Sequence, residues 1–127
     1  MKFHLNIALA VLVGAAIGAT AIGTLHAQGK GPAYVITDFT EITDAAGFAE
    51  AAKGLPASLA AGGGKLVART DAAVALDGPV PKRFAIFSFE SVEKAKAWYG
   101  SDAGKASTAG RLKNTKSRSF IVEGMPN

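Results

Sequence analysis

Three short segments carry hydrophobic side chains at both odd and even positions. Residues 33–39, 83–89 and 117–123 are rich in Val, Ile, Phe and Tyr, and in each segment the apolar residues occupy both parities. This pattern is typical of β-strands whose two faces are both covered, because a strand with one face in water alternates apolar and polar residues. The pattern therefore predicts a sheet with two apolar faces.

The stretch after the first of these strands has the spacing of an amphipathic helix. Asp44 is a predicted N-cap, and Pro56 is predicted to kink the helix, which should end at the glycines of residues 62–64. Apolar residues recur every three or four positions and place one stripe on one face. These residues are Ala45, Phe48, Ala52, Leu55 and Leu59.

A second helical stretch lies between the third and last strands. Ser91 is a candidate cap for a short helix that runs through Trp98 and Tyr99. Gly100 and Ser101 should break this helix, and a weaker helical piece covers about residues 102–112. Ser101 is the expected cap of that piece.

The remaining strand and its turn complete the order of elements. Residues 65–69 and 73–76 are predicted to form a strand with an irregular middle, followed by a dense turn signal at residues 77–81. The order strand, helix, strand, strand, helix, strand predicts an α+β fold, a ferredoxin-like βαββαβ sandwich. We expect a four-stranded antiparallel sheet with two helices on one face. A second copy that packs sheet to sheet is the simplest cover for the other face.

The first 27 residues have the three parts of a secretory signal. Lys2 stands near the start, an apolar run covers residues 5–25, and small residues end at Ala27. Residues 21–23 are a second candidate cleavage site. Cleavage after Ala27 would leave residues 28–127 as a single domain, periplasmic or secreted. If the segment stayed uncleaved, its length would allow it to anchor the chain in a membrane.

The types of residue exclude several kinds of chemistry from residues 28–127. The only histidines are His4 and His26, and the chain has no cysteine. Ser/His and Cys/His nucleophile pairs, ordinary zinc sites and His or thiolate haem ligands are therefore excluded. We expect no metal and no cofactor. Without disulfides, stability must come from packing or oligomerisation, which favours a homodimer.

The net charge is modest and its excess lies late in the chain. Without Lys2, 13 basic residues stand against 10 acidic ones, which leaves +3. Five basic and no acidic residues lie between Lys105 and Arg118. This run lacks the interleaved aromatic residues of a nucleic-acid stacking surface. We therefore expect a solvated face and no nucleic-acid partner.

Several segments, in their order and spacing, resemble a known family. They include PKRF at residues 81–84, FES at 89–91 and AKAWY at 95–99, together with residues 33–39, 55–57, 63–65, 77–78 and 117–124. Over about residues 32–124 the chain resembles the family catalogued as domain of unknown function 1330. The resemblance implies a ferredoxin-like dimeric α/β-barrel, a superfamily that includes monooxygenases, haem-degrading enzymes and small-molecule binding proteins.

The chain departs from the family pattern at three positions. Family members commonly have an acidic residue at the position of Ser88 and tyrosines at the positions of Ala51 and Gly104. If those side chains line a pocket, the resemblance implies that this pocket lacks them. The retained positions are Arg69, Arg111, Trp98 and Ser101.

Five residues are candidates for a ligand site at the sheet interface. Arg69 and Arg111 could clamp a carboxylate or phosphate, or could be surface or dimer-edge arginines. Asp77 could pair with one of them or act as a general base, or could only form a turn. Tyr34 and Trp98 could supply the apolar wall, or Trp98 could be a core anchor. Two arginines against one carboxylate favour an anionic ligand.

Two classes of function follow from these features. The first is an exported, non-catalytic homodimer that binds a small apolar or anionic molecule between its sheets or serves as a structural partner. The second is a cofactor-independent monooxygenase-like enzyme or a related small-molecule enzyme. The missing histidine and thiol, and the departures from the family pattern, favour the first class.

Overall fold

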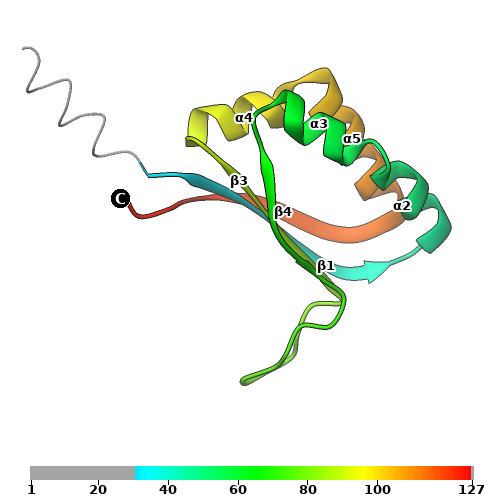
Figure 1. Cartoon of the computed structure of the whole chain (residues 1–127). Helices are drawn as coiled ribbons and strands as arrows, with labels where there is room; N and C mark the ends of the chain where they lie inside the picture. Colours follow the sequence, from blue (N-terminus) through cyan, green and yellow to red (C-terminus); the bar gives the residue numbers. More distant parts are fainter. Residues whose placement is uncertain (1–30, 127) are drawn as a thin grey trace, which may run out of the picture. The chain divides into compact units, whose positions relative to one another are not determined.

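Four strands and four helices make up residues 31–126, the part of the chain that the structure, a computed structural model, describes (Figure 1). The strands are β1 (Ala33–Ile42), β2 (Lys65–Thr70), β3 (Arg83–Phe89) and β4 (Thr115–Glu123), in the order β2-β3-β1-β4. The helices are α2 (Ala45–Ala52), α3 (Leu55–Ala61), α4 (Val92–Gly100) and α5 (Asp102–Asn114). All neighbouring strands are antiparallel, and the helices cover one face of the sheet. The predicted α+β, ferredoxin-like fold is confirmed.

Gly31–Met125 form one compact unit. The predicted signal segment and both candidate cleavage sites lie outside the described residues, so the export prediction stays a prediction. Within residues 31–126 no helix has the length and apolar character needed to cross a membrane.

Two elements differ from the prediction. The first helix is two helices, because α2 ends at Ala52 and α3 begins at Leu55, with Pro56 in its first turn. Proline fits that turn because the missing N–H has no intrahelical partner there. The prediction that residues 73–76 continue the second strand is wrong: β2 ends at Thr70. Val74 and Leu76 are 86% and 96% exposed in the connecting segment.

The predicted helix caps are confirmed. The side chain of Asp44 accepts a hydrogen bond from the Gly47 amide at 2.9 Å, and Ser91 accepts one from the Lys94 amide at 3.2 Å. Ser101 caps α5 through the Gly104 amide and also donates to the Trp98 carbonyl oxygen. Each cap satisfies an amide that the helix itself leaves without a partner, which fixes where the helix begins.

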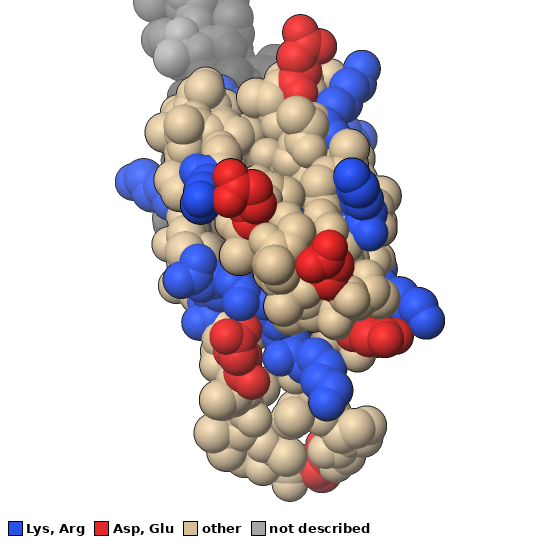
Figure 2. All heavy atoms as spheres, turned by 90° about the vertical axis from the view of Figure 1, so that its right-hand side faces the viewer, with Lys and Arg blue, Asp and Glu red and all other residues tan. Residues whose placement is uncertain are grey.

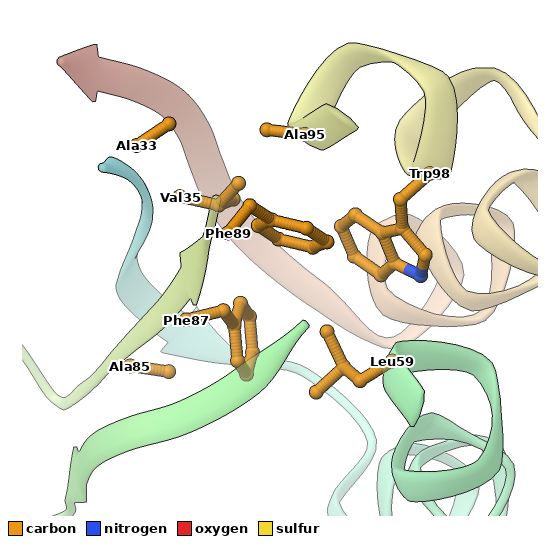
Figure 3. Packing of buried hydrophobic residues seen from close by; sticks show 8 residues of the cluster. All are labelled: Ala33, Val35, Leu59, Ala85, Phe87, Phe89, Ala95 and Trp98. Carbon is orange, nitrogen blue, oxygen red and sulfur yellow. The ribbon is translucent and has the colours of Figure 1, made fainter. Parts of the chain in front are cut away.

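The core lies between the helices and one face of the sheet, around Trp98 (Figure 3). Its ring centroid lies 5.4 Å from that of Phe89 and 6.2 Å from that of Phe87. The indole N–H donates to Ser58 Oγ at 3.0 Å, and both side chains are buried. A Cβ at Gly62 would lie 2.7 Å from Trp98 Cδ1, so the end of α3 can approach the ring only as glycine. Trp98 thus joins α3, α4 and the sheet.

The other face of the sheet, here called the outer face, is also apolar. In β1 the odd positions up to Phe39 are buried against the helices and the even positions are half-buried. The strand register joins Ala68, Ile86, Ile36 and Phe120 in one row across all four strands of the outer face. Phe120 and Val122 are each 42% exposed, and the described helices lie on the other face of the sheet (Figure 1). The predicted pair of apolar faces is therefore present.

The bond between Ser58 and Trp98 generates a stability prediction. Ser58→Ala should lower the free energy of unfolding by about 1–3 kcal/mol, because the buried indole N–H loses its partner. In a Trp98→Phe background, where that donor is gone, the same change should cost less than about 0.5 kcal/mol. Urea unfolding followed by circular dichroism measures the free energy of unfolding of the parent, the two single variants and the double variant. Equal costs in both backgrounds would contradict the assigned role of the bond.

Candidate functional site

A cavity of about 310 Å³ lies between the sheet and the helices of one chain. Every described strand and helix contributes at least one side chain to its lining. From β1 and β3 the lining side chains are those at odd positions, such as Val35, Thr37 and Phe87. The roof includes Phe48, Leu59 and Trp98. The pocket predicted from the sequence lay elsewhere, on the outer face, where a second copy would pack sheet to sheet.

Small side chains account for this space. The roof presents Ala51 and Ala52 from α2 and Ala60 from α3, and the floor presents Ala85 from β3. Among residues 31–126 no large side chain has an exposed fraction below 2%. A helix–sheet interface filled to the usual interior density would bury several such side chains completely. The alanines therefore leave a hollow that no side chain of the described residues fills.

The floor changes from apolar to polar along the strands. One row of the register contains Leu66, Phe87 and Val35, and its side chains are all apolar. The next row on the same face contains Arg69, Ala85, Thr37 and Ser119, and we call it the polar row. The third row contains Arg83, Phe39 and Ser117. The hydroxyls of Thr37 and Ser119 are 2.7 Å apart. One end of the cavity is thus apolar and the other polar and cationic.

Arg111 enters the cavity from α5 without an acidic partner. Its Nη1 donates to Ser117 Oγ at 2.6 Å, and no ion pair involving Arg111 is found among the described residues. Burial lowers the pKa of the Arg111 guanidinium from its usual range, and the neighbouring Tyr99 opposes this shift. The guanidinium remains charged near neutral pH, because arginine does not deprotonate in proteins. Folding removes part of this positive charge from water and gives it only neutral hydroxyl neighbours, which costs free energy.

The other two arginines of the cavity differ from each other. Arg83 Nη1 lies 2.8 Å from Asp71 Oδ1, and its guanidinium lies 5.3 Å from the centre of the Phe48 ring. Its charge is therefore neutralised. Arg69 is exposed and, within residues 31–126, forms no ion pair. No Asp or Glu of the described residues lines the cavity, so Arg69 and Arg111 leave it with an uncompensated positive charge.

The structure brings three of the five candidate site residues together. Arg69, Trp98 and Arg111 line the cavity. Tyr34 is at an even position of β1 and lies on the outer face, so it does not share a wall with Trp98. Asp77 is exposed in the segment between β2 and β3 and is not among the lining residues. The carboxylate that pairs with a cavity arginine is that of Asp71, and its partner is Arg83.

Four of the polar residues that line the cavity were not among the five candidates: Thr37, Arg83, Tyr99 and Ser119. Strand parity was the available signal for three of them, because Thr37, Arg83 and Ser119 share a face with Val35 and Phe87. Polar residues on a strand parity that is otherwise apolar indicate either a hydrogen-bonded pair or a site. Tyr99 follows Trp98 directly, and its position on the sequence carried no such signal.

The three departures from the family pattern lie in different places. Ala51 lines the cavity, so a tyrosine at this position would occupy part of the space. Ser88 lies on the outer face, opposite Tyr34 and Lys65. A Cβ at Gly104 would collide with the Trp98 carbonyl oxygen, so this backbone has room for no side chain. Of the three, the alanine at position 51 is the one that enlarges the cavity.

The predicted basic run is mostly a solvated face. Lys105, Lys113, Lys116 and Arg118 are exposed, and the last two pair with Glu41 at 3.2 Å and Asp38 at 3.4 Å. Arg111 is the member of the run that turns inward. Within residues 31–126 no three acidic or histidine side chains gather into a group that could hold a metal ion.

Solved structures of other proteins share this fold. A protein of unknown function from Rhodopseudomonas palustris matches with a TM-score of 0.63 and 15% identity, over 77% of this chain and 85% of that one. A dimeric protein of unknown function with a ferredoxin-like fold from Bacteroides fragilis matches with a TM-score of 0.50 and 14% identity, over 75% and 98%. SnoaB, a cofactor-independent oxygenase from Streptomyces nogalater, matches with 0.51 and 12%, over 72% and 91%. At these identities the likeness establishes the fold.

No curated protein matches the chain. The model of one family does match, and it covers nearly all of the compact unit. This agrees with the resemblance of the segments between residues 32 and 124. Because the model of the domain of unknown function DUF1330 matches residues 32–125, the chain belongs to the DUF1330 family.

Proposed function

We propose that the chain is exported and works as a homodimer that binds a small, mainly apolar or anionic molecule, one in the cavity of each subunit. The observation that carries this proposal is the cavity itself, which is largely apolar and holds a half-buried arginine without an acidic partner. Ligand sites are typically concave and apolar, with a few polar groups that fix orientation. The cavity volume lies at the lower end of their usual range of about 300–1,000 Å³.

The free-energy cost of partly burying the Arg111 guanidinium supports a binding role. A half-buried charge without an acidic partner opposes folding, which favours a role for Arg111 other than stabilising the fold. The hydroxyl of Ser117 would not lose its only partner if Arg111 were replaced, because Thr115 Oγ1 lies 2.8 Å from it. This guanidinium therefore contributes little to the stability of the fold.

The outer face and the segment between β2 and β3 support a homodimer. The row through Ile86, Ile36 and Phe120 is an apolar surface of the kind that sheet-to-sheet packing buries. The segment of residues 71–82 extends away from the helices (Figure 1). Figure 2 shows this segment as a largely uncharged projection at the bottom of the view. Its exposed Val74 and Leu76 would be covered if they reached a second copy packed on the outer face.

Export rests on the sequence of residues 1–27. We infer cleavage after Ala27 and a periplasmic or secreted protein, because Lys2, the apolar run and the small residues form the three parts of a signal. The membrane would be a partner only if the segment stayed uncleaved.

The alternative function is that of a cofactor-independent monooxygenase-like enzyme. The shared fold with SnoaB from Streptomyces nogalater favours it, at 12% identity. The cavity supplies a phenol at Tyr99 and hydroxyls at Thr37 and Ser119, but no carboxylate, imidazole or thiol that could act as a base of ordinary pKa. Consumption of dioxygen by the purified protein in the presence of its bound molecule would distinguish catalysis from binding.

The direct test of the proposed function is native mass spectrometry of the protein purified from the organism that makes it. We expect a subunit mass that corresponds to residues 28–127 and a dimer of about 20 kDa. We also expect a retained molecule that is released when the dimer is denatured. A full-length, soluble chain would contradict export. A dimer that never carries a molecule, in this preparation or after incubation with small organic acids, would contradict ligand binding.

The Arg111→Met variant tests whether this arginine is needed for folding. We expect an unchanged free energy of unfolding, or one higher by about 1 kcal/mol, because methionine removes a charge that is costly to bury. Arg83→Met is the matched comparison and should lower the free energy by up to about 1 kcal/mol through loss of its pair with Asp71. Urea unfolding measures both. A loss above about 2 kcal/mol for Arg111→Met would identify a structural residue.

The Phe120→Glu variant tests the outer face as the dimer interface. A charge in this apolar row should convert residues 28–127 to monomers of about 10 kDa at micromolar concentration, because an unpaired carboxylate cannot be buried between two sheets. Leu112→Glu on α5 is the control, since Leu112 is 54% exposed but lies on the helix side. Sedimentation equilibrium measures both masses. A monomeric parent, or a dimeric Phe120→Glu variant, would rule out this interface.

A further inference from the structure

We infer that the molecule bound in the cavity is a carboxylic acid with a compact apolar body, whose carboxylate lies over the polar row and whose apolar end faces Phe87 and Trp98. This inference rests on the proposed function and specifies the ligand of the same cavity. It follows from the charge of the lining, from the direction of the polarity gradient and from the donors available.

The charge of the lining selects an anion. Arg83 is neutralised by Asp71, whereas Arg69 and Arg111 have no acidic partner among the described residues. In a cavity whose walls are largely apolar, the field of the half-buried Arg111 is weakly screened, and the exposed Arg69 adds a second, solvent-screened positive charge. A ligand carboxylate would supply the missing partner, and guanidinium groups form strong, directional hydrogen bonds with carboxylates. A neutral ligand would leave the cost of Arg111 burial unrelieved.

The gradient along the floor fixes the orientation of the ligand. The apolar row through Phe87 and Val35 lies two residues along each strand from Ala85 and Thr37 of the polar row. Trp98 packs against Phe87 and Phe89 at the apolar end. A molecule with one charged end therefore matches the cavity in one direction only, with its body along the strands.

The donors at the polar end suit a carboxylate. Arg69 lies on edge strand β2, and Arg111 bonds to Ser117 on the opposite edge strand β4. The two arginines thus line the cavity at opposite edges of the sheet. In the hydroxyl pair of Thr37 and Ser119, one proton makes the mutual bond and the other is free to be donated to a ligand oxygen.

A phosphate ester fits the cavity less well. Phosphate sites in proteins usually draw on the backbone amides at a helix N-terminus. The helix that brings its first residues to the cavity is α3, through Leu55 and Pro56, and Pro56 has no amide hydrogen. The volume of about 310 Å³ is at the lower end of the range of small-molecule sites, which favours a compact acid.

The protein itself provides the probe for the experiment. Trp98 is the single tryptophan of the chain and lines the cavity, so its fluorescence reports occupancy. We would titrate residues 28–127 with octanoate, 3-cyclohexylpropanoate, the primary amides of both acids, and octyl phosphate. Each acid should bind at least about tenfold more tightly than its amide. This ratio of dissociation constants corresponds to the net contribution of one charge-assisted hydrogen bond. Binding of the acids should fall as the pH drops through their own pKa, near 4–5 for a carboxyl group.

Variants connect the preference to the two arginines. Arg69→Gln and Arg111→Gln should each weaken octanoate binding about tenfold and change octanamide binding less than about twofold. Arg118→Gln, an exposed arginine of the outer face, is the matched control and should change neither. Ala51→Phe should weaken acid and amide together, because it fills the cavity. Arg69 is exposed, so its variant should fold even if the Arg111 variant does not.

The outcomes separate the two proposals. Equal affinity of acid and amide, or losses of equal size in the Arg118→Gln control, would overturn the carboxylate inference and leave cavity binding intact. Octyl phosphate binding more than about tenfold more tightly than octanoate would overturn the carboxylate in favour of a phosphate head. Failure of every compound to change Trp98 fluorescence would overturn the proposed binding function together with the inference.

Discussion

The packing of Trp98 is the interaction on which the rest of the structure depends. Its ring contacts Phe87 and Phe89 of β3, its N–H bonds to Ser58 of α3, and its carbonyl oxygen accepts from the Ser101 cap of α5. One residue thereby holds three helices at a fixed height above the sheet. Because α2 and α3 present Ala51, Ala52 and Ala60 at this height, a space remains between these helices and the sheet. The cavity follows from one large side chain that sets the spacing and from alanines that do not fill it.

Electrostatics then divides the cavity into unlike ends. The Arg83–Asp71 pair shows how this fold neutralises an arginine when a carboxylate is near. Arg111 has no such partner and is solvated instead by the hydroxyl of Ser117, with Tyr99 close by. A neutral hydroxyl offsets less of the desolvation cost than a carboxylate does. The folded chain therefore contains a region whose electrostatic energy would fall on binding an anion, which is a thermodynamic basis for affinity and not only a geometric one.

The sequence was sufficient for the fold and insufficient for the site. Strand parity, the caps at Asp44, Ser91 and Ser101 and the order of elements are local signals, and the structure agrees with them. The location of the cavity is not local. Because both parities of β1 are apolar, nothing in the pattern says whether Tyr34 or Val35 faces the helices, and the sequence analysis placed Tyr34 beside Trp98 on one wall. The register and the helix positions resolve this. Asp77 lies outside the cavity, and the one arginine of the cavity with a carboxylate partner among the described residues is Arg83, which pairs with Asp71.

The two faces of the sheet are chemically separate but mechanically joined. Val35 and Thr37 belong to the cavity, and their chain neighbours Ile36 and Tyr34 belong to the outer face. A shift of one residue in strand register would exchange the two sets of side chains, so the register must be the same for both faces. If a second copy covers the outer face, it fixes β1 and β4 from below and thereby fixes the spacing of Thr37 and Ser119 above. Dimerisation would then order the floor of the cavity without contributing a side chain to it. A chain without disulfides or a cluster of metal-ligating residues in its described part could in this way hold a preformed cavity beneath alanine-rich helices.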